Sequence, residues 1–175
     1  MAFGNRLIDA GGVSGPDIGD LAEGGVVFYV DGSGGGLVAT LNNNYAPMLQ
    51  CTNNNVGTST AFGTGESNTN ALFALGTPCI YSSVSIGIAV NATEGGYTDW
   101  YSPSLSELQT MYDNVGPTSA FNNIVGFYLN SKYISSSTYP YNPQTQFGMI
   151  AGTNSRSNYF EPANYNQYFK YIRAF

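Results

Sequence analysis

The chain contains no histidine among its 175 residues. Histidine is the usual general base near neutral pH and the usual partner of a nucleophilic serine or cysteine, so its absence excludes those catalytic systems. It also excludes histidine-containing zinc sites, and the two cysteines cannot complete a thiolate zinc site alone. We therefore expect a protein that is not an enzyme and that has no catalytic residues, no metal site and no cofactor.

Charged residues are also scarce, at 9% of the chain with a net charge of −6. Nucleic-acid binding needs clustered bases, and the five bases are scattered, so we expect no nucleic-acid partner. No apolar run is long enough for a transmembrane helix, so we expect no membrane insertion. The polar surface must consist of Asn, Ser, Thr, Gln, Gly and Tyr, which suits contact with sugars or protein neighbours.

Two cysteines, Cys51 and Cys79, allow one disulfide at most. Their spacing is not that of a metal knuckle or a redox pair, and a pair of buried free thiols is an equal alternative. Residues 1–18 are rich in glycine and poor in apolar residues, which indicates an N-terminal arm that contacts a neighbour, or else an ordinary frayed terminus. The first 20 residues lack the apolar core of a secretory signal, so we expect export by lysis or by assembly into a particle.

The most secure local structure is a β-hairpin. The β-branched and aromatic runs 26–30 and 37–41 flank a glycine-rich turn that no Gly-Lys-Ser/Thr follows, so the turn is not a phosphate loop. Beyond a long polar loop, the cap residues 67–70 precede a short expected helix over 71–75. Residues 81–90 are expected to be irregular or strand.

A second helix is expected from Ser104, because Ser104 and Glu107 have the spacing of a capping box. Glu107 is also a formal candidate for a catalytic acid, but the cap explains it more simply. Apolar residues at three- and four-residue spacing give this helix one buried face. We expect one core that contains Phe28, Trp100, Leu105, Leu108 and Met111.

Short apolar segments separated by polar loops occupy the rest of the chain, and the last of them, 168–175, is expected to be a terminal strand. The order of elements predicts an α+β fold with an antiparallel sheet, two short helices and long loops. Carboxylates at Glu94 and Asp99 leave calcium open as a weak alternative, although no EF-hand-like string is present.

Four segments carry a family resemblance: residues 19–30, 63–70, 98–108 and 170–175. Together they resemble the C-type lectin-like and sulfatase-modifying-factor-like domains of the Fibrobacter major paralogous family, in its phage or bacterial surface branch. The resemblance covers residues 19–175 and implies a C-type lectin-like domain. Sulfatase-modifying relatives need a cysteine pair near the C-terminus, where this chain has none, so it implies no enzyme activity.

The resemblance and the low charge together favour a virion structural or attachment module, such as a bacteriophage tail-fibre, tail-tip or capsid-decoration protein. Its partners would be other virion proteins or further copies of itself, with a host surface glycan as a further candidate. The alternative is an extracellular carbohydrate-binding or adhesin domain of a bacterial surface protein. In either setting we expect a virion or extracellular location.

Tyrosines among Asn, Ser and Gln are typical of adaptable binding surfaces, although single rings are more often part of the core. In this fold family the region equivalent to 129–166 lies at one end of a rigid sheet, where loops vary without disturbing the core. We therefore expect the contact surface on those loops, unless they only pack against neighbouring subunits. The candidate binding residues are Tyr139, Tyr141, Asn154, Arg156 and Tyr159.

Overall fold

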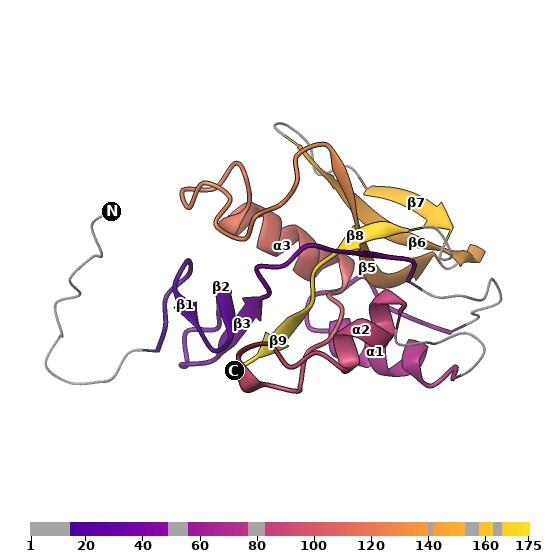
Figure 1. The fold of residues 1–175 in the computed structure, drawn as a ribbon, viewed down its shortest axis with the longest axis horizontal. Helices are drawn as coiled ribbons and strands as arrows, with labels where there is room; N and C mark the ends of the chain where they lie inside the picture. The colour runs from indigo at the N-terminus through magenta and orange to yellow at the C-terminus, as the bar shows by residue number, and fades with distance from the viewer. Residues whose placement is uncertain (1–14, 49–55, 77–82, 140–141, 153–157, 163–165) are drawn as a thin grey trace, which may run out of the picture.

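The structure is a computed structural model, and it describes residues 15–48, 56–76, 83–139, 142–152, 158–162 and 166–175. It is an α+β fold built on two sheets that are antiparallel apart from one strand pair (Figure 1). The four-stranded sheet has the order β1 (Leu21–Ala22), β2 (Gly25–Val30), β3 (Gly36–Ala39), β9 (Ile172–Ala174). The five-stranded sheet has the order β4 (Asn44–Ala46), β8 (Gln167–Phe169), β5 (Ser131–Tyr139), β6 (Asn142–Ala151), β7 (Asn158–Pro162).

The expected hairpin is confirmed, with β2 and β3 paired antiparallel around the glycine turn. The expected single terminal strand is wrong, because residues 168–175 form parts of two strands in different sheets. β8 pairs with β4 and β5, whereas β9 pairs with β3, so that the last strand lies beside the opening hairpin (Figure 1). The break falls at Lys170 and Tyr171, where the backbone passes from one sheet to the other.

Three helices accompany the sheets: α1 (Gly65–Phe73), α2 (Ser85–Val90) and α3 (Leu105–Val115), with a 3-10 turn, η1 (Glu94–Gly96). The first helix begins earlier than expected, because Asn68 and Thr69 are helical residues whose side chains bind Ser59 and Ser102 instead of capping. Residues 85–90 are helical, so the expectation of irregular or strand structure there is wrong. Within the described ranges no helix is long and apolar enough to cross a membrane.

The capping box of α3 is present as expected. The Ser104 amide donates to the Glu107 carboxylate at 2.7 Å, and the Glu107 amide donates to the Ser104 hydroxyl at 3.3 Å. Glu107 is fully buried and also accepts from the Gly63 amide at 3.2 Å, so it joins the preceding loop to the helix. A Cβ on residue 65 would lie 2.2 Å from the Glu107 carboxylate, so only glycine fits at this position without a shift. Burial raises the pKa of Glu107.

The four-stranded sheet is buried on both faces. Val26 and Phe28 contact one apolar cluster, which includes Leu108 and Met111 of α3. Val27, which points the opposite way, belongs to a second cluster with residues of α1 and α2. The expectation of one core is therefore wrong for Trp100, which lies in the second cluster. Leu105 is buried at the start of α3.

Truncating Leu108 to alanine should lower the free energy of unfolding by about 2–5 kcal/mol, because its side chain is fully buried against the sheet. Urea denaturation of the two proteins measures the difference. Leu21→Ala is the matched control, since Leu21 is 68% exposed, and it should change stability by less than about 0.5 kcal/mol. Equal losses in both variants would contradict the packing of α3 described here.

Candidate binding surface

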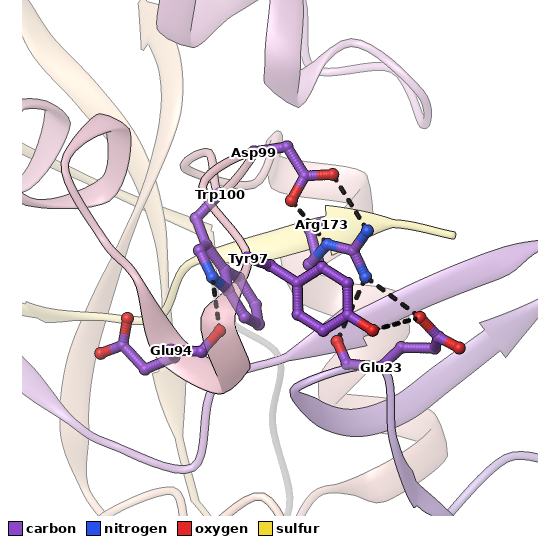
Figure 2. Close-up of polar contacts among 6 residues, drawn as sticks. All are labelled: Glu23, Glu94, Tyr97, Asp99, Trp100 and Arg173. Carbon is purple, nitrogen blue, oxygen red and sulfur yellow. Dashed lines mark hydrogen bonds and ion pairs between the residues drawn. The ribbon is translucent and has the colours of Figure 1, made fainter.

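Three of the four segments that carry the family resemblance, 19–30, 98–108 and 170–175, meet around one side chain, Arg173 of β9 (Figure 2). Its guanidinium donates to both carboxylate oxygens of Asp99, at 2.6 and 3.0 Å. It also donates to the main-chain oxygen of Glu23 at 3.2 Å, and it lies 3.8 Å from the centre of the Tyr97 ring. We call these four residues the Arg173 cluster.

Polar groups within the cluster and beside it also form hydrogen bonds within the protein. The Tyr97 hydroxyl donates to the Glu23 carboxylate at 3.0 Å, and the Trp100 indole donates to the Glu94 carbonyl at 3.2 Å (Figure 2). The Glu94 carboxylate accepts a hydrogen bond from the Tyr171 hydroxyl. The two carboxylates considered for calcium are therefore engaged by Arg173 and Tyr171. The described residues contain no group of three or more His, Cys, Asp or Glu that could hold a metal.

Arg173→Lys should destabilise the fold, because a lysine cannot reproduce the two-point contact with Asp99. The hydrogen bonds from Arg173 lower the pKa of Asp99, so this carboxylate adds stability above its unfolded pKa, near 3.9, that is lost as the pH falls through the folded value. Urea unfolding at about pH 5 and about pH 2 should show a smaller acid-induced loss in the variant than in the unchanged protein. An identical acid-induced loss in both proteins would show that the pair of Arg173 and Asp99 contributes nothing to stability.

A second buried cation joins two loops. Lys170 is fully buried, and its ammonium donates to the main-chain oxygens of Leu41 at 2.8 Å and Val125 at 2.7 Å. The Phe127 ring lies 5.9 Å from the same nitrogen. Burial lowers the pKa of Lys170 to about 7. The residue therefore connects the loop after β3 to the loop before β5.

The pKa of Lys170 predicts a rise of stability with pH. Between about pH 7 and its usual value of 10.5, the unfolded chain binds a proton at this lysine that the folded chain does not. The free energy of unfolding should therefore increase from about pH 7 to about pH 9, below the pH at which tyrosines ionise. Lys170→Met should abolish this increase and exposed Lys132→Met should retain it. A pH-independent stability in the unchanged protein would contradict the prediction.

Exposed aromatic residues lie next to these contacts, on β4 and in the loop before β5. Tyr45 of β4 pairs in register with Tyr168 of β8, which pairs with Tyr133 of β5, so the three rings lie in a row on one face of the sheet. Tyr133 is fully buried, whereas Tyr45 is 59% exposed. Tyr128, from the loop before β5, is 53% exposed and its ring centre lies 5.2 Å from that of Tyr168. We call Tyr45, Tyr128 and Tyr168 the tyrosine surface.

The tyrosine surface rests on a packed base. Tyr168 lies 5.0 Å from Tyr45 and 5.7 Å from Tyr133, measured between ring centres, and Tyr133 in turn packs edge-on against Phe127 at 4.7 Å. Because the inner rings are buried, the outer rings have a fixed support. A surface that is ordered before binding loses less conformational entropy when a partner binds.

Polar bonds beneath the rings fix the two loops to each other. The Tyr133 hydroxyl accepts from the Tyr128 amide at 2.9 Å and donates to the Asn43 side chain at 2.8 Å. The Asn43 amide group donates to the Gly126 carbonyl at 2.6 Å. With the two bonds from Lys170, these contacts set the positions of β4, which carries Tyr45, and of the loop that carries Tyr128. Leu41 and Leu129, in the same loops, are each 50% exposed.

The comparisons with known proteins bear on the fold. No protein-family model matches the sequence, and no curated protein matches it. Among solved structures, a fimbrial protein from Bacteroides ovatus matches with a TM-score of 0.53 and 14% sequence identity. The likeness is one of fold. It covers 78% of this chain and 35% of the fimbrial protein, so the chain spans about a third of that protein's length.

Two of the candidate binding residues chosen from the sequence, Tyr139 and Tyr159, lie on strands. Tyr139 ends β5 and is partly buried, with its ring centre 5.7 Å from that of Phe147. Tyr159 lies on β7, where its backbone pairs with that of Gly148 on β6. Outside the described residues lie Tyr141, Asn154, Arg156, Cys51 and Cys79. Where the region 129–166 is described, most of it forms the strands β5, β6 and β7, which flank the loops expected to carry the contact surface. The expected contact surface on these residues stays a prediction.

Tyr45 and Tyr168 were not selected from the sequence. Tyr45 follows the run Asn42–Asn44, and Tyr168 lies in a segment expected to be an ordinary terminal strand. The signal was the Asn-Tyr composition around position 45, the same composition that drew attention to the later tyrosines. Only the pairing of β4 with β8 brings Tyr45 next to Tyr168 and, through it, to Tyr128.

Proposed function

We propose that the chain is a non-enzymatic attachment module that presents the tyrosine surface to a binding partner. The observation that carries the proposal is the exposure of Tyr45 and Tyr128 above a buried, hydrogen-bonded base. Tyrosine is enriched at protein contact surfaces, because its ring adds apolar area and its hydroxyl adds a hydrogen bond with few rotatable bonds. Exposed apolar residues gathered in this way mark interaction sites.

The chemistry of the remaining residues supports a role without catalysis. The chain has no histidine, and the acids singled out in the sequence have structural partners. Glu107 caps α3, and Asp99 and Glu23 bind Arg173.

The proposal includes a C-type lectin-like fold of the Fibrobacter major paralogous type for residues 19–175. Its support is the pairing of the closing strand β9 with β3 of the opening hairpin, and the meeting of three of the four resembling segments at Arg173. Residues 1–18 would then be an arm used in assembly.

Two settings fit an attachment module. The fold likeness to a protein described as fimbrial favours an adhesin or carbohydrate-binding domain on a bacterial surface. The charge-poor composition and the glycine-rich arm support a virion protein of a bacteriophage tail fibre, tail tip or capsid decoration. Mass spectrometry of purified particles and of shed surface fibres from the producing cells separates them. Absence of the chain from both fractions would remove both settings.

The double variant Tyr45→Ala/Tyr128→Ala should bind cells at least about tenfold more weakly than the unchanged protein, because it removes both outer rings. Fluorescently labelled protein titrated onto a panel of bacterial cells measures this binding. Phe73→Ala is the matched control, since Phe73 is an exposed aromatic residue on α1, 44% accessible, and should bind normally. The variant pair Tyr139→Ala and Tyr159→Ala tests the surface expected from the sequence in the same assay. Full binding by the Tyr45 and Tyr128 variant would contradict the proposal.

A further inference from the structure

We infer that the tyrosine surface binds neutral glycans by stacking their apolar ring faces on Tyr45 and Tyr128. This inference rests on the proposed function and names the class of ligand for the same surface. Tyr45 and Tyr128 lie within about 10 Å of each other, since the centre of each ring is about 5 Å from that of Tyr168. That span suits a few sugar units.

The polar residues beside the rings suit hydroxyl groups. Exposed asparagines precede or follow the tyrosines in each of the three segments: Asn42, Asn130 and Asn166. A side-chain amide both donates and accepts hydrogen bonds, as a sugar hydroxyl does. Tyrosine hydroxyls add the same two-way capacity at the rim of each ring. The surface therefore combines apolar faces with neutral hydrogen-bonding groups.

The absence of charge decides between neutral and anionic glycans. The segments 41–46, 121–131 and 166–169 contain no Asp, Glu, Lys or Arg. Two cations directly follow these segments in the sequence. Lys170 is fully buried and donates to the main-chain oxygens of Leu41 and Val125. Lys132 is exposed, but it lies on the opposite face of β5 from Tyr133, because successive side chains of a strand alternate between faces. Sulfated or carboxylated glycans need exposed cations, and the net charge of −6 repels them. Neutral polysaccharides match the surface.

Affinity electrophoresis tests the inference with the whole chain. Gels that contain a soluble β-glucan, a mannan, a galactan or a xylan should retard the unchanged protein in at least one case. Tyr45→Ala and Tyr128→Ala should each weaken that binding about tenfold, a loss of about 1.4 kcal/mol. Tyr45→Phe, which retains the ring, should lose less than about threefold, because stacking is the main contact. Phe73→Ala should migrate as the unchanged protein does.

Three results would overturn the inference: no retardation in any of the four gels, equal retardation of both alanine variants and the unchanged protein, or preferential binding to a sulfated or uronic-acid polymer. Melting curves of the variants check that each is folded, as expected for changes at exposed rings.

Treated cells separate failure of this inference from failure of the proposed function. Periodate cleaves the vicinal diols of glycans, so it should abolish binding of the labelled chain to cells, whereas protease treatment should leave binding intact. Binding that depends on Tyr45 and Tyr128 but is lost after protease and kept after periodate would identify a protein partner. That outcome would reject the glycan and retain the attachment function.

Discussion

The pairing of β9 with β3 is the interaction on which the remaining structure depends. It adds the last described strand to the opening hairpin, and the Arg173 side chain on β9 then binds both Asp99 and the turn that contains Glu23. Because β8 immediately precedes β9 in the chain, the position of β9 also fixes β8 in the second sheet. The row of Tyr45, Tyr168 and Tyr133 follows from the placement of β8.

The properties that local chemistry controls were predictable from the sequence. The hairpin and the capping box at Ser104 and Glu107 depend on neighbouring residues, and both are confirmed. The expectations that were wrong concern long-range contacts. The early start of α1 depends on bonds from Asn68 to Ser59 and from Thr69 to Ser102, and the division of the terminal segment depends on which sheet each half joins.

The candidate surface was predictable in composition and not in location. Tyrosine with asparagine indicated recognition, but the pattern occurs at several places in the chain. Exposure separates the tyrosines: Tyr133 is fully buried, whereas Tyr45 is 59% exposed. The buried Tyr133 ring supports Tyr45 through Tyr168, so tyrosines form both the base and the contact face of the surface.

The passage of the chain from one sheet to the other at Lys170 and Tyr171 has a consequence for synthesis on the ribosome. Neither sheet is complete until the residues up to 174 have left the exit tunnel, because β8 and β9 supply an inner strand of one sheet and the strand that closes the other. Until then β4 and one edge of β3 lack the strands that they pair with. The domain must therefore fold late, after these residues emerge, and nascent chains that stall before this point expose apolar strand edges to chaperones.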